Sequence, residues 1–355
     1  MKLISKTDIR GLNILDLKNA FSSNGYQPFR GQQVYEWLWK KSCIDFNEMT
    51  NLNAETKNWL KDNYVIHAIR VEDKQISSDG TIKSGFRLHD GHLIEGVLIP
   101  ADERMTACVS SQIGCSLTCK FCATGTLTRE RNLTPGEIYD QVVHIKKWAY
   151  SHYQKPLTNI VFMGMGEPLL NYANVIKGIE KITSPEGLGM SSDRITVSTA
   201  GIAKMIIKLA DDEVKFNLAV SLHAANDIKR NLIMPINETN NLQAVGEALR
   251  YFCTKTKKQV TFEYIAFKNF NESLKDAKEL LAFCKRIPAK INIIEYNPTG
   301  DGLFEKADSK KIENFCAFLE RNGMIARIRR SRGKDIDAAC GQLANKKHEE
   351  AIADK

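Results

Sequence analysis

Residues 114–122 are GCSLTCKFC, and the prediction of the fold starts from this stretch. It holds Cys115, Cys119 and Cys122 at C-x3-C-x2-C spacing. A cubic 4Fe-4S cluster normally takes four cysteine thiolates, so a loop that supplies three leaves one iron open for another ligand. Phe121, next to the last thiol, suits an apolar wall that shields such a cluster from water. The spacing therefore predicts the cluster-binding loop of an enzyme.

Zinc, disulfides and ordinary packing are the other uses that the cysteines allow. Structural zinc takes four ligands, usually as two Cys/His pairs, and no fourth Cys or His lies at hairpin distance from the stretch. The chain has nine cysteines, and thiols in a reducing cytosol serve metals or catalysis rather than disulfides. We predict packing roles for the four that lie in apolar or helical patterns, namely Cys43, Cys253, Cys284 and Cys316.

The composition is that of a globular protein. A length of 355 residues with 43% hydrophobic content allows one large core and a small accessory domain. The first residues lack the apolar run of a signal peptide, and no stretch has the roughly 18 uncharged residues of a membrane helix. A cytoplasmic location and no membrane partner are therefore expected. The net charge of +8 favours a polyanionic partner, although many basic proteins bind no nucleic acid.

The hydrophobic pattern divides the chain into four parts. In the first part, Val34, Trp37 and Leu38 recur at the spacing of a helix with one buried face. In the second, apolar and polar residues alternate around Asp79-Gly80 and Asp90-Gly91, which are typical hairpin turns. The predicted parts are a small helical accessory domain at 1–72, a β-meander that joins the two domains at 73–104, a main domain at 105–330, and a C-terminal loop with a charged tail at 331–355.

The main domain alternates apolar, β-rich runs with helical stretches. Thr134, Pro135 and Glu137 form a capping box with proline in the first turn, which predicts a helix start. Six β/α units in this order predict an α/β fold with a parallel sheet curved as an incomplete barrel, whose ligands bind at the carboxyl ends of the strands. The predicted strands are 105–110, 159–163, 194–199, 215–222, 259–266 and 290–296, with a last strand at 325–330.

Three motifs far apart in the chain point to one family. They are CVSSQIGC at 108–115, GMGEPL at 164–169 and RGKDIDAACGQL at 332–343, with a weaker match in PFRGQQ at 28–33. The cysteine loop resembles the signature of radical S-adenosylmethionine enzymes, and the set resembles one branch of them, the RNA adenine C2-methyltransferases. The resemblance implies a partial (β/α)6 barrel, a 4Fe-4S cluster and S-adenosyl-L-methionine. It also implies 23S ribosomal RNA and transfer RNA as substrates, an RNA-contacting accessory domain, and an external electron donor such as flavodoxin or ferredoxin.

The strand ends supply the residues that the resemblance assigns to the cofactors. Cys115, Cys119 and Cys122 would ligate the cluster. Gly166 and Glu167 would hold the amino group of S-adenosylmethionine, since glycine lets a ligand approach main-chain carbonyls closely. His223 is equally typical of a structural histidine on sequence alone. The remaining residues implied to contact the ribose, carboxylate and adenine of S-adenosylmethionine are Ser198, Ser221, Leu222, His223 and Asn297.

Three residues are implied to be catalytic. Glu95 is a lone carboxylate in an apolar strand. If it is buried, it needs a partner or a raised pKa; the alternative is that it lies on an exposed face of the strand. Cys108 and Cys340 could be buried packing thiols. The resemblance implies instead that Cys340 carries a methyl group whose carbon a radical activates and joins to C2. Glu95 would then remove the C2 proton while Cys108 attacks the Cys340 sulfur, which releases the base and leaves a disulfide.

Five of the eight residues at 327–334 are basic, directly before the Cys340 loop. We predict that this run positions RNA phosphates, although such runs are often only solvated. A sister family that methylates C8 of adenine in ribosomal RNA and confers antibiotic resistance shares the cysteines. It differs at the positions of Pro168 and of Arg332-Gly333. A non-enzymatic iron-sulfur RNA-binding protein would explain the charge and the loop but not Cys340, and an activase of another protein has no use for a methyl-carrying cysteine.

Overall fold

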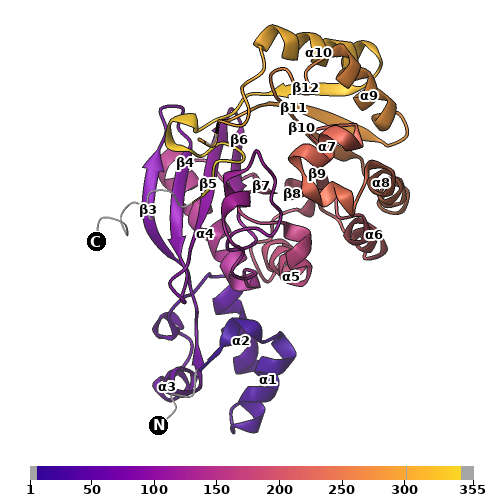
Figure 1. Ribbon diagram of the computed structural model, residues 1–355. Helices are drawn as coiled ribbons and strands as arrows, with labels where there is room; N and C mark the ends of the chain where they lie inside the picture. The colour runs from indigo at the N-terminus through magenta and orange to yellow at the C-terminus, as the bar shows by residue number, and fades with distance from the viewer. Residues whose placement is uncertain (1–5, 301, 345–355) are drawn as a thin grey trace.

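A computed structural model describes residues 6–300 and 302–344, and the predicted tail from Asn345 lies outside this range. The protein is a mixed α/β structure built on one ten-stranded sheet, ordered β12-β11-β10-β9-β8-β7-β6-β5-β4-β3 (Figure 1). The order is open between β12 and β3. Within the described ranges, no helix combines the length and apolarity that are needed to cross a membrane.

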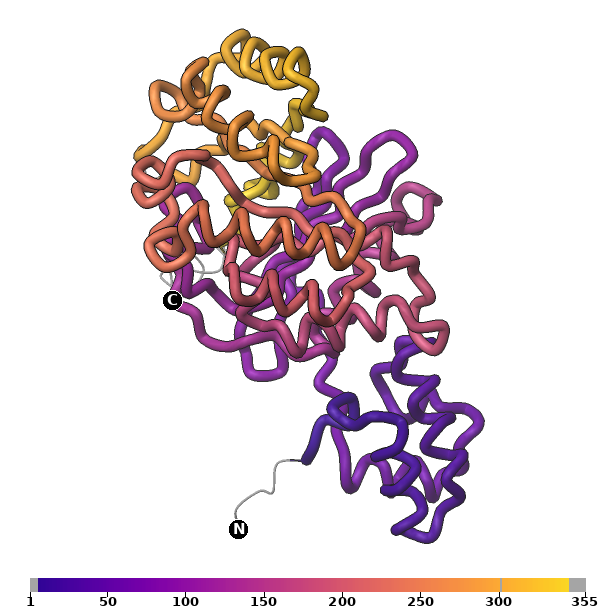
Figure 2. The backbone as a smooth tube through the Cα atoms, turned by 90° about the vertical axis from the view of Figure 1, so that its right-hand side faces the viewer, coloured from indigo at the N-terminus to yellow at the C-terminus, as the bar shows by residue number. Residues whose placement is uncertain are grey.

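The N-terminal part is helical, as predicted, and Figure 2 shows it as a lobe below the main domain. Leu38 and Trp39 are buried in its core with Phe21, whose ring packs edge-to-face on Trp59 at 4.9 Å. Two short strands pair in parallel at its border. Its elements are β1 (Thr7–Asp8), η1 (Ile9–Gly11), α1 (Ile14–Ser23), α2 (Phe29–Trp39), η2 (Phe46–Glu48), α3 (Ala54–Asn63) and β2 (Tyr64–Val65).

The meander consists of β3 (Arg70–Ile76), β4 (Ile82–Arg87), β5 (Leu93–Ala101) and β6 (Arg104–Cys108). Its strands pair antiparallel, with the predicted hairpin turns between them. β6 pairs antiparallel with β5 on one side and parallel with β7 on the other. The meander was expected to join two domains, whereas it is the continuation of the main sheet itself.

The rest of the sheet is parallel, and its helices are arranged around it as the six β/α units predict. Two helices rather than one follow β9. The incomplete barrel is confirmed. Its elements are η3 (Ala123–Thr126), α4 (Pro135–Tyr153), β7 (Asn159–Phe162), η4 (Pro168–Asn171), α5 (Tyr172–Thr183), η5 (Ser192–Arg194), β8 (Ile195–Thr199), α6 (Ala203–Asp211), β9 (Asn217–Ser221), α7 (Asp227–Ile233), η6 (Pro235–Glu238), α8 (Leu242–Thr256), β10 (Val260–Ala266), α9 (Leu274–Cys284), β11 (Ala289–Glu295), α10 (Ser309–Arg321), β12 (Ile325–Arg329) and η7 (Lys334–Ile336).

The helix α4 begins where its sequence says it should. The Thr134 hydroxyl accepts a hydrogen bond from Glu137 N, and the Glu137 carboxylate accepts one from Thr134 N, which satisfies two of the free amides of the first turn. Further along α4, Gln141 hydrogen-bonds both the N–H and the carbonyl of Ser110, directly after β6. The helix therefore supports the strand end that leads into the cysteine loop.

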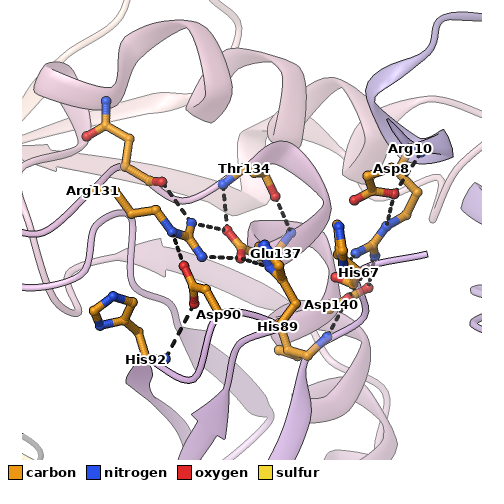
Figure 3. A network of polar contacts seen from close by, with 12 residues as sticks. Asp8, Arg10, His67, His89, Asp90, His92, Arg131, Thr134, Glu137 and Asp140 are labelled. Atoms are coloured by element: carbon orange, nitrogen blue, oxygen red, sulfur yellow. Dashed lines mark hydrogen bonds and ion pairs between the residues drawn. The ribbon is translucent and has the colours of Figure 1, made fainter. Parts of the chain in front are cut away.

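A buried ion pair fastens the N-terminal lobe to α4 (Figure 3). Nη1 of Arg10 lies 2.8 Å from both carboxylate oxygens of Asp140, which also accepts a hydrogen bond from Ile69 N at 3.1 Å. Arg10 also donates to the carbonyl of His67. Both charged groups are out of water, and Asp140 is the nearest counter-ion of Arg10, with Asp8 Oδ1 farther away at 3.8 Å from Nε.

We predict that Asp140→Ala lowers the free energy of unfolding by about 3–5 kcal/mol, because it leaves the Arg10 guanidinium buried without its counter-ion. Urea unfolding followed by circular dichroism measures this change. The matched control is Glu72→Ala, which removes the partner of Arg87 in an exposed pair and should cost about 1 kcal/mol or less. Equal losses in the two variants would contradict the structural role given to the buried pair.

Candidate active site

The three thiols of the predicted cluster loop face one cavity, which we call the cluster cavity. Cys115, Cys119 and Cys122 all line it. Lys120 N donates to the carbonyl of Ile233 at 3.0 Å, which ties the loop to the end of α7. In the described part of the chain, no three His, Cys, Asp or Glu side chains are grouped to hold a single metal ion. The thiols thus surround a cavity rather than one point.

Burial raises the pKa of all three thiols. The pKa of Cys115 is raised to about 11, and the pKa values of Cys119 and Cys122 are also raised, with burial as the main cause. An iron-sulfur cluster binds thiolates, so its assembly here must release protons. The ring of Phe121 lies edge-to-face with that of His223 at 4.6 Å and forms part of an apolar cluster beside the loop.

Gly166 and Glu167 line the cluster cavity after β7. Gly166 has φ +92°, and a Cβ there would lie 2.4 Å from Cβ of Gln112, so only glycine fits. The Glu167 carboxylate accepts hydrogen bonds from Leu169 N at 3.0 Å and Ala200 N at 2.7 Å. Burial raises the pKa of Glu167. Both backbone and carboxylate are therefore held in place before any ligand binds.

Ser198 and Ser221, at the ends of β8 and β9, line the same cavity with His223. Leu222 is buried and does not line it; its N–H donates to the carbonyl of Glu263 at 3.0 Å. The structure thus brings three of these four predicted side chains to the cavity. Leu222 reaches the site only through its backbone.

His223 has a fixed orientation and a neutral ring. Its Nδ1 accepts a hydrogen bond from Ile265 N at 3.0 Å, and its carbonyl accepts one from Asn271 Nδ2 at 2.6 Å. Burial, with the charge of Arg230 adding to it, lowers the pKa of His223 to about 3. Since Nδ1 is an acceptor, the neutral ring carries its proton on Nε2 and is a donor there.

Arg230 is a residue of this site that the sequence did not indicate. Its guanidinium is buried and donates to the carbonyls of Ala200 at 2.6 Å, Ser221 at 3.2 Å and Leu222 at 3.1 Å, and to Asn237 Oδ1 at 2.6 Å. Burial lowers its pKa to about 10, so it stays charged at neutral pH. One cation of α7 thereby fixes the ends of two neighbouring strands.

Cys340 lies at the boundary between two cavities. It lines the cluster cavity, and it also lines a second cavity inside the barrel, which we call the lumen cavity. Cys108 and Arg329 line the lumen cavity as well. Asn297 Nδ2 donates to the carbonyl of Cys340 at 3.3 Å, while its buried Oδ1 has no hydrogen-bond donor among the described residues.

Cys108 and Cys340 are close enough to influence each other. Burial raises the pKa of Cys108 to about 12, and the charge of Cys340 is the second cause. All nine cysteines belong to the described residues and are free. A disulfide between these two therefore stays a prediction for the turning-over enzyme.

Glu95 is buried on β5 and has the partner that burial requires. Its Oε1 lies 3.3 Å from Nζ of Lys83, and its Oε2 accepts a hydrogen bond from Ala344 N at 2.8 Å. Glu95 is not among the residues that line the cluster cavity or the lumen cavity. The role that the resemblance implies for Glu95, removal of the C2 proton, stays a prediction.

Two family models match the chain. The model described as Ribosomal RNA large subunit methyltransferase N-terminal domain matches residues 7–66, and that of the Radical SAM superfamily matches residues 109–283. A protein of Cytophaga hutchinsonii named "Probable dual-specificity RNA methyltransferase RlmN" is 63% identical, over 97% of this chain and 94% of the relative. The chain belongs to the RlmN family. The resemblance found in the sequence is confirmed.

More distant relatives also cover almost all of the chain. A relative of the same name in Salinibacter ruber is 43% identical over 96% of this chain and 94% of its own. The crystal structure of a radical SAM methyltransferase from Sphaerobacter thermophilus is 36% identical and superposes with a TM-score of 0.90, covering 95% of this chain and 99% of that one. The fold described above is thus that of a known methyltransferase.

The cofactors of radical SAM enzymes are a 4Fe-4S cluster and S-adenosylmethionine, and the site of this RlmN family member fits them. The loop supplies three thiols, Cys115, Cys119 and Cys122, and a cluster held by three thiolates leaves one iron free for another ligand. Gly166 lines the cavity with a backbone conformation that favours glycine, and His223 offers an N–H there. Asn297, which lines neither cavity but bonds the carbonyl of Cys340, has a buried Oδ1 that accepts no hydrogen bond from the described residues. Donor set and shape agree with both cofactors.

The segment 331–343, which we call the strap, carries Cys340 across the open side of the sheet from β12 to the β3–β4 hairpin (Figure 1). At the hairpin, Gly333 N donates to Asp79 Oδ2 at 2.8 Å, and Ser77 Oγ donates to Asp335 Oδ1 at 2.5 Å. The strap also bonds to the cluster loop, since Ala123 N donates to the carbonyl of Gly341 at 2.7 Å.

The basic run 327–334 has two kinds of surroundings. Glu295, buried at the end of β11, pairs with Arg330, with Lys334 at 2.9 Å and with Lys306 at 3.4 Å. Arg327, Arg329, Arg330 and Arg332 line the lumen cavity. Two of the five cations of the run thus neutralise a buried carboxylate of the same chain, and the positioning of RNA phosphates by the run stays a prediction.

Glu263, Glu295 and Arg230 are site residues that our sequence reasoning missed. Glu263 and Glu295 carry the signal that singled out Glu95, a lone carboxylate in an apolar strand. That signal could have identified them. Arg230 lies in a polar helical stretch and has no such signal, because a buried arginine and a solvated one look alike in sequence.

We predict that Gly166→Ala abolishes S-adenosylmethionine binding, measured by equilibrium dialysis, and lowers the free energy of unfolding by more than about 1 kcal/mol. The variant has both an unfavourable positive φ and a collision with Gln112. The matched control is Gly189→Ala, which has φ +65° but open space, and should cost less and leave binding intact. Equal behaviour of both variants would count against the close-packed backbone at Gly166.

We predict that Glu295→Gln loosens the strap, with hydrogen exchange of residues 331–343 roughly 10-fold faster or more, because Arg330, Lys334 and Lys306 lose the buried anion that they share. Glu313→Gln is the control; Glu313 lies 3.7 Å from Arg330 but is exposed, so exchange should hardly change. Burial acts to raise the pKa of Glu295, but hydrogen bonds from Lys334 and Arg330 outweigh it and lower the pKa to about 2. In the wild type, the contribution of ionised Glu295 to stability is complete above about pH 4.3, the pKa of an unperturbed Glu, and is lost as the pH falls toward 2.

Proposed function

We propose that this protein is a radical S-adenosylmethionine enzyme that methylates C2 of adenine in 23S ribosomal RNA and in transfer RNA. The family supports this proposal, because its members are named dual-specificity RNA methyltransferases. Cys115, Cys119 and Cys122 hold the cluster. Gly166, Glu167, Ser198, Ser221, the backbone of Leu222, His223 and Asn297 bind S-adenosylmethionine.

The position of Cys340 is the single observation that carries the mechanism. A methyl carrier must first face the methyl donor and then the base that receives the carbon. Cys340 lines the cavity that contains the cluster ligands and also the lumen cavity, where the basic side chains gather. One side chain can thus serve both partners with no large movement of the chain.

Bound in the cluster cavity, the two cofactors supply a methyl group to a thiolate and a radical that removes hydrogen from the resulting thioether. The protein residues do the rest. Cys340 accepts the methyl group and presents its carbon to C2 of an adenine in the lumen cavity. Cys108, on the same cavity wall, attacks the sulfur of Cys340; an S–S bond forms as the C–S bond to the base breaks, and the resulting disulfide must be reduced before the next turnover. Because the pKa of Cys108 is raised, that thiol must lose its proton during the attack.

Other parts of the proposal depend on the family resemblance alone. These are the removal of the C2 proton by Glu95, which lies outside both cavities. They also include an electron donor such as flavodoxin or ferredoxin, an RNA-contacting role for residues 1–72, and a cytoplasmic location. The domain limits at 72, 104 and 330 likewise stay proposals.

The proposal is tested with two cysteine variants of the reconstituted enzyme. Cys340→Ala has no methyl carrier and should form no bond to RNA. In Cys108→Ala, the carbon carried by Cys340 can still bond to C2 of the adenine, but no thiol attacks the Cys340 sulfur to release the base. A covalent protein–RNA species should therefore accumulate. A denaturing gel reveals this species, and peptide mass spectrometry should locate it on Cys340. The control is Cys284→Ala, a buried thiol on α9, which should turn over normally.

Two outcomes would overturn the assignment of roles. One is normal turnover by Cys108→Ala, and the other is an adduct that forms in Cys340→Ala. Mass spectrometry of the product nucleoside distinguishes the two family chemistries, since 2-methyladenosine is expected and 8-methyladenosine would favour the C8 sister family.

A further inference from the structure

Glu263 has a buried carboxylate oxygen without a donor at the boundary of the two cavities. The residue lies on β10, is 4% exposed, and lines both the cluster cavity and the lumen cavity. Its Oε1 accepts a hydrogen bond from Asn292 Nδ2 at 2.8 Å. Its Oε2 accepts none from the described residues. A buried carboxylate oxygen in this state is costly, which points to a ligand that donates to it.

The carboxylate is held toward the lumen cavity. Asn292, which fixes it, lines the lumen cavity and not the cluster cavity. The other neighbour is Arg329, whose Nη1 lies 3.6 Å from Glu263 Oε2. Arg329 also adjoins Cys340, because the charge of Cys340 is the main cause that raises the pKa of Arg329. Along this wall the order is therefore Cys340, Arg329, Glu263.

The Watson–Crick edge of adenine has the matching order of groups. C2 is followed by N1, which accepts a hydrogen bond, and then by C6 with its amino group, which donates. Arg329 can only donate, and the ionised carboxylate of Glu263 can only accept. A base removed from its stack is commonly recognised through hydrogen bonds to this edge.

We infer that Glu263 and Arg329 select the target base by its Watson–Crick edge. Glu263 Oε2 accepts a hydrogen bond from the amino group, Arg329 donates to N1, and C2 faces the sulfur of Cys340. The inference depends on the proposed function, because it concerns the base that this site methylates. It names specificity-determining residues rather than a further step of the reaction.

The arrangement excludes guanine by charge as well as by shape. Guanine presents an oxygen where adenine has the amino group, an N–H at N1, and an amino group on C2. Its oxygen, an acceptor, would face the carboxylate, which is also an acceptor. Its N1–H, a donor, would face the guanidinium, which is also a donor. Sites that leave buried polar groups unpaired reject the wrong ligand strongly.

Two short RNAs test the inference, one with adenosine at the target position and one with purine riboside, which lacks the amino group. Wild-type enzyme should prefer adenosine by roughly 10- to 100-fold in kcat/KM, the effect of one hydrogen bond to a charged group. In Glu263→Met, which has a similar length and no acceptor, the ratio should fall to near 1. Glu263→Gln keeps one acceptor oxygen and should give an intermediate ratio. Equilibrium binding of both RNAs should follow the same order.

The matched control is Glu272→Met. Glu272 is also buried with an Oε2 that lacks a donor among the described residues, but it lines a different cavity beside Lys311. Its adenosine preference should equal that of the wild type. The ratio compares two RNAs on one preparation, so it does not depend on how much of a variant is folded.

A wild-type ratio retained in Glu263→Met would overturn the inference. So would a Glu263→Met enzyme that no longer methylates Cys340 in the absence of RNA, because Glu263 would then serve the cofactor. If wild-type enzyme methylates no adenosine-containing RNA, the proposed function itself fails, and that result is distinct from a change in the ratio.

Discussion

The sheet of this protein is open between β12 and β3, and the site depends on how that side is closed. A strand would close it by a ladder of backbone hydrogen bonds. The strap closes it through side chains instead, with Glu295 at one end and Asp79 and Asp335 at the other. Such a closure can open without breaking the sheet, because its bonds are independent of the strand ladder. Cys340, the proposed methyl carrier, thereby lies on a segment that forms no strand.

Buried charges are used throughout to hold irregular backbone. Arg230 donates to three carbonyls at the ends of β8 and β9, and Glu167 accepts from two amides. Each group satisfies polar atoms that no helix or strand could satisfy, and this offsets the cost of removing it from water. Among the residues around Cys340, Glu263 and Asn297 are the exceptions, since each leaves one buried oxygen without a hydrogen-bond donor among the described residues. They lie beside Cys340, where ligands are expected to supply the missing partners.

Much of the fold could be predicted from local pattern. The strands from β6 to β12 lie where apolar runs indicated, and α4 begins at its capping box. The continuity of the meander with the main sheet could not be predicted, because strand order depends on pairing between segments and not on either segment's own residues. For the same reason, the sequence could not show which residues of the basic run pair with carboxylates of the chain. Whether Arg330 faces RNA or Glu295 depends on which residue the fold brings opposite to it.

The sequence by itself determined the cysteine spacing, the glycine at 166, the order of β/α units and the family, since all of these depend on residues that are neighbours in the chain or on motifs. The tertiary structure alone decided that Cys340 stands between two cavities, that Glu95 lies outside both, and that Glu263 places between them a carboxylate oxygen that accepts no hydrogen bond from the described residues. These positions depend on strands that are far apart in sequence and meet only when the sheet curves. The residues beside a given residue in the chain therefore do not indicate which residues lie opposite it across the barrel.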